Sequence, residues 1–428
     1  MRVLHINSTS HVGGAARAMQ RLHDSLLKKN HESQFLVGRS KFPDNLDVHI
    51  IWNETTSYRS FQNSILSRVG NQFEKYLGIN SWANRPAKHL SETEIYQWAD
   101  VIDLRNLFGG FFNLWSLPSL TAKKPVVWRL PDMWALTGHC AYPYDCDRWK
   151  SGCYQCPLLL GGGREIVEPK PTVMDGTNRV WKAKRNIYKQ SQLHVIVNSD
   201  WMRKQVQESI LKNVLTINVI SNGVDLDIFK PKPKNEARKK LGLPSEGSIL
   251  LWAAGSRGNY RKGYRLTVEA LESIQISGGK TPMLITMGSA KGWNDEETLQ
   301  KVKHFGYVRD PEKQALLFAA ADGFICSTLA DAQPQTALEA LACGTPLIAF
   351  DIGPMSELAI PGKTGYLVPK TNSASLCEAI TRFLNDEEVQ VRLGEYCRQE
   401  ALQKYDLNKQ TDQYLVLYER ILAERKFI

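Results

Sequence analysis

The sequence predicts an α/β protein made of two doubly wound parallel sheets. Short apolar strands alternate with helical patterns through residues 3–198, and the same alternation restarts at residue 248 after a turn and a Pro/Lys-rich stretch. A chain of 428 residues is also too long for one ordinary core. We therefore expect an N-terminal domain over residues 1–222 and a C-terminal domain over residues 223–405.

Composition excludes several classes of protein. The chain is 43% hydrophobic and 23% charged, which is typical of a soluble globular protein, and it contains no run of about 20 apolar residues that could span a bilayer. Its N-terminus enters a strand directly and lacks a signal-peptide core. We therefore expect a cytoplasmic protein. The net charge of +10 favours anionic partners of several kinds.

The first α/β unit contains a glycine pair. Residues 3–6 form an apolar strand, residues 7–12 a polar loop, and a helix is expected over 15–28, with Gly13 and Gly14 between them. Such glycines allow a ligand to approach the backbone closely, although they also serve as a simple tight turn. Further strands of this half are expected at 34–37, 101–104, 126–130 and 194–198.

Four of the eight cysteines lie close together after the strand at 126–130. They are Cys140, Cys146, Cys153 and Cys156, with the spacing C-x5-C-x6-C-x2-C. Clustered thiols in a reducing compartment favour a structural zinc site, with disulfides and free thiols as the alternatives. The scattered cysteines are expected in the core: Cys326, Cys343, Cys377 and Cys397.

The second half carries a basic, glycine-containing loop between expected strands at 248–253 and 283–287. Arg257, Arg261 and Lys262 crowd this loop just before a helix. Cations in such a place can neutralise a leaving diphosphate without a metal ion. A solvated basic loop is the alternative.

Two carboxylates flank the start of a later helix. Asp331 is followed after eight positions by Glu339, and the helix over 337–342 ends at Gly344 before a strand at 347–350. Helix amides can take a diphosphate or sugar oxygens, and carboxylates accept hydrogen bonds from sugar or ribose hydroxyls. The pattern outlines a nucleotide-sugar site, and surface carboxylates beside an ordinary helix start are the alternative.

This segment resembles the Glu-x7-Glu motif of retaining glycosyltransferases of family 4, including the alanine-rich helix and the CGTP turn after it. The sequence departs from the motif by having Asp331 at its first acidic position. The resemblance extends over nearly the whole chain. It implies the GT-B fold, with two Rossmann-like domains facing across a cleft, a Cys-rich insertion at 139–157, and a helix over 406–428 that returns to the first domain.

The resemblance also implies roles for individual residues. It places Asp331 by the transferred sugar, together with the backbone around Gln335 and Thr336, and Glu339 on the nucleotide ribose. Pro131 stands where many members carry an active-site histidine, and proline cannot shuttle a proton, so any such role passes to Asp132 or to His139 on the acceptor side. Asp132 is favoured because it ends a strand. The residues implied to contact the rest of the donor are Gly13, Gly14, Arg257, Arg261, Lys262 and, through its backbone, Val308.

The expected activity is transfer of a sugar from a nucleoside-diphosphate sugar of the UDP or GDP type. The acceptor would be an oligosaccharide or lipid-linked hydroxyl, and catalysis would need no cofactor. Residues 58–77 form a basic amphipathic pattern that could rest on the inner face of a membrane or could face the core. A nucleotide-sugar epimerase of the same fold is the first alternative. A zinc-containing nucleic-acid-binding protein is the second, although we expect no nucleic-acid partner because paired carboxylates repel phosphates.

Overall fold

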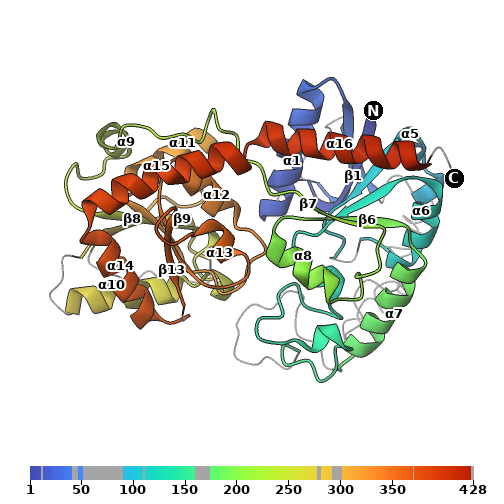
Figure 1. The fold of residues 1–428 in the computed structure, drawn as a ribbon, viewed down its shortest axis with the longest axis horizontal. Coiled ribbons are helices and arrows are strands. Elements are labelled where there is room, and N and C mark those ends of the chain that lie inside the picture. The colour runs from blue at the N-terminus through green and yellow to red at the C-terminus, as the bar shows by residue number, and fades with distance from the viewer. Residues whose placement is uncertain are drawn as a thin grey trace. The chain divides into compact units, whose positions relative to one another are not determined.

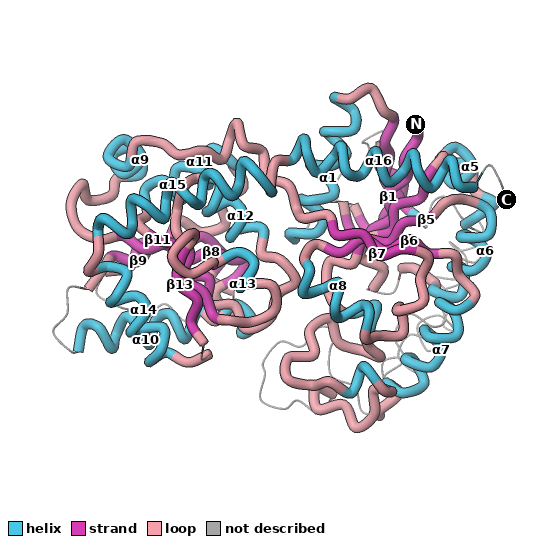
Figure 2. The backbone as a smooth tube through the Cα atoms, viewed as in Figure 1, coloured by secondary structure: helices cyan, strands magenta, loops and turns pink. Residues whose placement is uncertain are grey.

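The computed structural model describes residues 1–10, 13–40, 47–51, 90–108, 111–159, 174–276, 281–291, 301–369 and 371–425. It divides into two compact units (Figure 1). Unit 1 comprises Met1–Ile220 and Thr411–Ile428, and unit 2 comprises Ser221–Gln410. In each unit the strands lie inside and helices surround them (Figure 2). The predicted pair of parallel-sheet, Rossmann-like domains is confirmed.

Unit 1 contains a parallel sheet in the order β3-β2-β1-β4-β5-β6-β7. Its strands are β1 (Arg2–Thr9), β2 (Glu32–Arg39), β3 (Val48–Ile50), β4 (Val101–Leu104), β5 (Val126–Arg129), β6 (Leu193–Val197) and β7 (Thr216–Val219). Its helices in the described residues include α1 (Gly13–Lys28), α5 (Glu94–Trp98), α6 (Leu117–Lys123), α7 (Thr177–Lys189) and α8 (Asp200–Gln207).

Unit 2 repeats this design with the order β10-β9-β8-β11-β12-β13, again parallel. The strands are β8 (Ile249–Ser256), β9 (Met283–Ser289), β10 (Val302–His304), β11 (Gly323–Cys326), β12 (Leu347–Phe350) and β13 (Gly365–Val368). The helices are α9 (Lys234–Leu241), α10 (Tyr264–Ile276), α11 (Pro311–Ala320), α12 (Gln335–Ala342), α13 (Met355–Leu358), α14 (Ser373–Leu384) and α15 (Glu387–Lys404).

The strand order creates one switch point in each sheet. The chain moves outward from β1 in one direction through β2 and then returns to β4 on its other side, and in unit 2 it does the same around β8 and β11. In doubly wound sheets, ligands bind beyond the carboxyl ends of the strands at this point, because the loops there diverge to opposite faces. The functional groups of unit 2 are therefore expected after Ser256 and Cys326.

Burial explains why the central strands are continuous apolar runs. Every residue of β4, β5 and β6 is buried, since helices cover both faces of a parallel sheet. In α12, the residues from Ala337 to Ala342 are all buried. Its small side chains allow the helix to lie close to its neighbours, which accounts for the alanine-rich sequence of this segment.

The C-terminal helix α16 (Leu407–Arg425) packs on the sheet of unit 1, as predicted. Tyr414, Leu417, Tyr418 and Ile421 follow helical spacing and share a core with residues of β1, β4, β5 and β6. The hydroxyl of Tyr418 also donates to the Asp103 carboxylate at 2.9 Å.

Asp103 is part of a fully buried polar network in unit 1. Its Oδ2 atom lies 2.9 Å from His5 Nδ1 and 2.5 Å from Arg105 Nη2. Burial alone would raise the pKa of Asp103, but the neighbouring Arg105 charge and the His5 hydrogen bond outweigh it and lower the pKa to about 2. The network therefore ties β1, β4 and α16 together through one ionised carboxylate.

Candidate functional site

A cluster of three charged side chains lies at the switch point of unit 2. Asp331 Oδ2 accepts a hydrogen bond from Arg261 Nη1 at 2.9 Å and from Lys262 Nζ at 2.6 Å. Arg261 and Lys262 follow β8, and Asp331 follows β11. The structure thus joins two of the predicted cations to the first predicted carboxylate.

The loop that carries the two cations is pinned to the end of β11. The Ser327 hydroxyl donates to the Gly263 carbonyl at 2.9 Å, and the backbone N–H of Leu329 donates to the Arg261 carbonyl at 2.7 Å. Gly263 has φ +66°, and a Cβ atom there would lie 1.9 Å from the Ser327 carbonyl oxygen. Only glycine allows this close approach.

Charge pairing outweighs burial at Asp331. Burial by itself raises the pKa of a carboxyl group, but Lys262 and Arg261 lower the pKa of Asp331 to about 2. The three side chains are only 10–19% exposed. The cluster therefore holds two cations and one anion in a largely desolvated place, where an incoming anion would experience a net positive charge.

Helix α12 follows Asp331 in the chain and carries three further predicted donor residues, Gln335, Thr336 and Glu339. Pro334 precedes it and provides no side-chain cap to the helix amides. Gln335 Nε2 donates to the Gly223 carbonyl at 3.0 Å, while its Oε1 atom is buried and accepts no hydrogen bond from the described residues. Glu339 lies one turn further along the helix and is only 3% exposed, and Thr336 is half-buried.

Two other predicted donor residues, Arg257 and Val308, contact other groups. Arg257 is buried, and its Nη1 atom lies 2.8 Å from His304 Nε2; it is not among the partners of Asp331. Val308 is also buried, and its carbonyl accepts from Gln314 Nε2 at 2.7 Å. Donor contacts by these two residues remain predictions.

Sequence reasoning missed the residues that hold the cluster in place. Asp331 Oδ1 accepts from the Gln333 backbone N–H at 3.2 Å, and the Gln333 side chain accepts from the Asn222 N–H at 2.8 Å. Ser327, which pins the basic loop, was missed too. A signal was available, because Ser327 directly follows a buried strand, where polar residues of α/β sites gather.

In unit 1, the predicted glycine pair opens α1. Gly13 has φ +87°, and a Cβ atom added to Gly13 or Gly14 would meet no heavy atom within 4 Å. The backbone here is therefore accessible from the side that a side chain would otherwise cover. Contact of this turn with donor or acceptor stays a prediction.

Asp132 follows β5 and starts a loop that α7 holds in place. Its Oδ1 atom accepts from the Trp134 N–H at 2.9 Å. From α7, the buried Lys184 donates to the carbonyls of Trp134 and Thr137 at 2.6 and 2.9 Å, and it lies over the Trp134 ring. Burial lowers the pKa of Lys184 to about 7.

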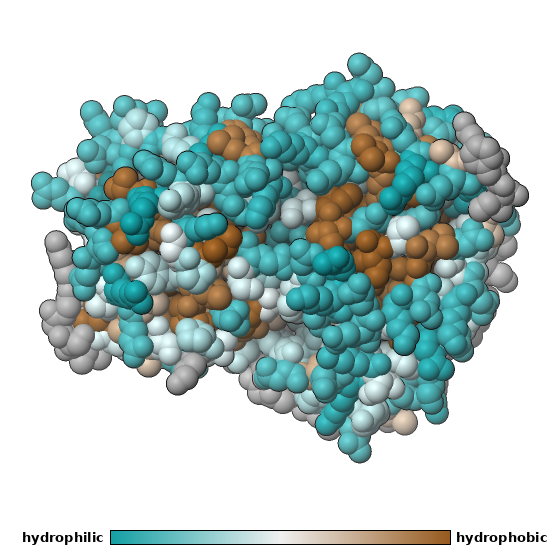
Figure 3. All heavy atoms as spheres, in the orientation of Figure 1, coloured by the Kyte–Doolittle hydropathy of each residue, from teal (hydrophilic) through white to brown (hydrophobic). Residues whose placement is uncertain are grey.

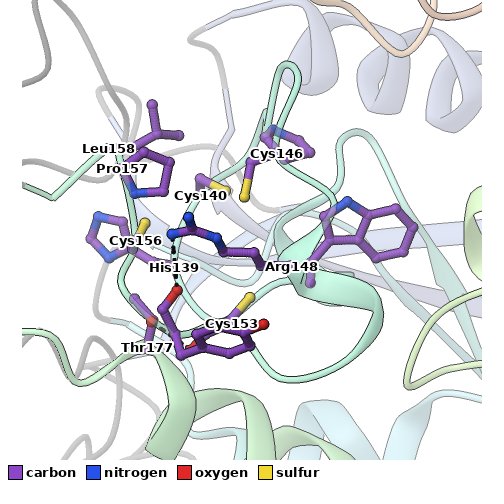
Figure 4. A pocket seen from close by; sticks show the side chains of 12 residues that line it. His139, Cys140, Cys146, Arg148, Cys153, Cys156, Pro157, Leu158 and Thr177 are labelled. Atoms are coloured by element: carbon purple, nitrogen blue, oxygen red, sulfur yellow. Dashed lines mark hydrogen bonds between the residues drawn. The ribbon is translucent and has the colours of Figure 1, made fainter.

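His139 lies with the cysteines. It is 2% exposed, and together with Cys140, Cys146, Cys153 and Cys156 it lines a small pocket of about 10 Å³ (Figure 4). All eight cysteines are free of disulfide bonds in the structure. This position beside the thiols fits a structural or metal-binding role for His139. A role of His139 in sugar binding stays a prediction.

Residues 233–400 match the family Glycosyl transferases group 1. The group 1 match includes the cluster of Arg261, Lys262 and Asp331 as well as Glu339. The Rossmann-like sheet of unit 2, the charged cluster and the family match therefore lie in the same part of the chain.

Curated proteins that are similar to this chain are distant from it in sequence. A D-inositol 3-phosphate glycosyltransferase of Corynebacterium urealyticum is 25% identical over 239 residues, 52% of this chain and 56% of that protein. The glycosyl transferase WcaC of Escherichia coli, named for colanic acid biosynthesis, is 24% identical over 82% of this chain and 83% of its own. The chain spans little more than half the length of the first relatives it matches.

Solved structures of similar fold cover almost the entire chain. Sucrose-phosphate synthase from Thermosynechococcus elongatus has a TM-score of 0.68 at 17% identity and covers 99% of both chains. Anabaena HepE, solved in complex with UDP, has a TM-score of 0.66 at 17% identity and covers 98% of this chain and 100% of its own. The fold is GT-B, as predicted.

The predicted membrane-contacting helix at 58–77 lies outside the described residues. Within the part of the chain that the structure describes, no helix has both the length and the apolar character needed to cross a bilayer. On the face shown in Figure 3, hydrophobic residues form separate areas among hydrophilic ones. Peripheral membrane contact thus remains a prediction.

Proposed function

We propose that this protein transfers a sugar from a nucleoside-diphosphate sugar to an acceptor hydroxyl, with retention at the anomeric carbon and without a catalytic metal. The observation that carries the proposal is the Arg261–Lys262–Asp331 cluster at the switch point of unit 2. Two cations on one fixed loop are suited to a group whose negative charge grows as the bond to the sugar breaks.

The donor would bind along the start of α12. Lys262 and Arg261 would neutralise the departing diphosphate, and Glu339 would accept from the ribose hydroxyls. The Asp331 carboxylate accepts three hydrogen bonds from the protein. Because a carboxylate can accept about four, one position is left for a sugar hydroxyl. The buried Gln335 Oε1 is a second acceptor, since leaving it unpaired costs about 1–3 kcal/mol that a sugar hydroxyl would recover.

The structural neighbours support a nucleotide donor. HepE has been solved with UDP and with UDP-glucose, and we infer a UDP-type donor for this chain by analogy. Relatives named for colanic acid biosynthesis and for D-inositol 3-phosphate support an acceptor in glycoconjugate synthesis. On the acceptor side, Asp132 is the residue of unit 1 that we propose as the proton acceptor or orienting group, because it lies in the loop that follows β5 (Val126–Arg129).

A donor screen tests the reaction. Purified protein is incubated with UDP- and GDP-sugars, and release of nucleoside diphosphate is measured with and without oligosaccharide or lipid extracts. Acceptor-dependent release supports transfer. Conversion of the donor sugar without any acceptor would instead identify the epimerase alternative.

Replacing a cluster cation tests the site. Lys262→Ala should lower turnover at saturating donor by about 10²-fold, as loss of one preorganised charge contact does elsewhere. Lys363→Ala, at an exposed lysine of the same unit, is the matched control and should leave turnover unchanged. Near-normal turnover of a folded Lys262→Ala protein would refute the assignment.

A further inference from the structure

The cysteine pocket belongs to unit 1 and is lined mostly by the segment that follows β5. The segment from Thr137 to Leu159 contains only one short 3-10 turn, at Arg148–Lys150, so it has little regular structure to fix it. Loops of this length without secondary structure are uncommon in compact domains and need another source of order. Here the segment folds back so that cysteines from its beginning and its end line one pocket (Figure 4).

All four cysteines line the same small pocket, together with His139, Arg148 and Thr177. Mutual proximity of four sulfurs around one small space is the arrangement from which a tetrahedral thiolate site forms.

A backbone group is placed to stabilise one thiolate. The Gly138 N–H donates to Cys153 Sγ at 3.2 Å. N–H donors to sulfur favour the deprotonated form that a metal requires, and they orient the ligand.

The C-x2-C segment also adopts an unfavourable backbone conformation. Cys153 has φ +49° and Gln155 has φ +46°, which place both in the left-handed region although neither is glycine. Each such residue costs about 1 kcal/mol or more and persists only where its surroundings stabilise it. Arg148 supplies part of this stabilisation, because it donates to the carbonyls of Tyr154 and Gln155.

Charge balance at the pocket is suited to a cation bound by thiolates. Four thiolates around a divalent cation carry a net charge of −2, because four negative charges outweigh two positive ones. Arg148, which lines the pocket, provides positive charge nearby, and the buried Lys184 adds to it when it is protonated. Asp175, which accepts from the Cys156 N–H at 2.9 Å, is a nearby carboxylate and opposes them in part.

We propose that Cys140, Cys146, Cys153 and Cys156 form a structural zinc site that fixes the segment after β5. In the described residues, no three His, Cys, Asp or Glu side chains are yet arranged closely enough to hold an ion, so binding requires the four thiols to converge to about 2.3 Å from the metal. Each thiol loses its proton, and no electrons are transferred. A closed site of four sulfurs has no open position for catalysis.

Metal content of the full chain tests the proposal. Protein purified without chelator should contain about one zinc per chain by elemental analysis. Cys153→Ser and Cys156→Ser should each lose most of that zinc, whereas Cys377→Ser, at a half-buried cysteine of α14, should retain it. If the serine variants do not fold, the wild-type protein alone decides the question, since chelator should lower its melting temperature and added zinc should restore it.

Three results would overturn the site. They are absence of zinc together with a melting temperature that zinc does not raise, equal zinc content in Cys153→Ser and wild type, and mass spectrometry that finds the four cysteines in disulfides. None of these readouts depends on sugar transfer, so failure of the proposed activity and failure of the zinc site are distinguishable.

Discussion

Replacing Asp331 with asparagine should destabilise unit 2 by about 2 kcal/mol at pH 7. Lys262 and Arg261 lower the pKa of this carboxyl from 3.8 to about 2 against the effect of burial. Each pKa unit corresponds to about 1.4 kcal/mol of interaction that favours the ionised form. Asparagine cannot carry that charge, and the two cations would then face each other without their shared partner.

The sign of the pH dependence follows from the lowered pKa. The stabilisation is fully present above the unfolded value near 4 and is lost as the pH falls towards 2. The difference in the free energy of unfolding between wild type and Asp331→Asn should therefore fall at pH 3 to about half of its value at pH 7. Urea unfolding followed by circular dichroism at pH 7, 5, 4 and 3 measures this difference.

Asp351→Asn, at an exposed carboxylate of the same unit, is the matched control and should change stability little at any pH. Equal stability of Asp331→Asn and wild type at pH 7 would refute the reasoning. So would a difference that stays constant down to pH 3, because that would come from side-chain packing and not from ionisation.

Two more substitutions test how the chain positions its functional groups. Gly263→Ala should lower the free energy of unfolding by about 3 kcal/mol and reduce turnover of the donor, because the added Cβ would overlap the Ser327 carbonyl. Gly362→Ala is the control: Gly362 has a similar φ but open space around it, and the substitution should cost about 1 kcal/mol. Similar melting temperatures for the two glycine variants would contradict this. Tyr418→Phe should cost about 2 kcal/mol, because a buried ionised Asp103 loses a donor. An unchanged melting temperature would show that this hydrogen bond contributes nothing to docking of α16.

The local pattern of the sequence was sufficient to predict the α/β class. Continuous apolar runs identified the buried strands β1, β4, β5, β6, β8, β11 and β12, because strands covered on both faces alternate little. The strands that the pattern did not identify, β3, β10 and β13, have three or four residues and few buried positions. Runs this short have no readable period.

The sequence by itself determined which chemical groups the site contains, because Arg261, Lys262, Asp331 and Glu339 lie at recognisable places relative to glycines, strands and a helix start. Only the tertiary structure decided which of them meet. Asp331 pairs with cations 69 and 70 residues earlier because β11 lies beside β8, and Arg257 on the same loop is paired with His304 instead. Strand order is set by the burial of whole faces and by the handedness of crossovers, and neither is written in any local stretch of sequence.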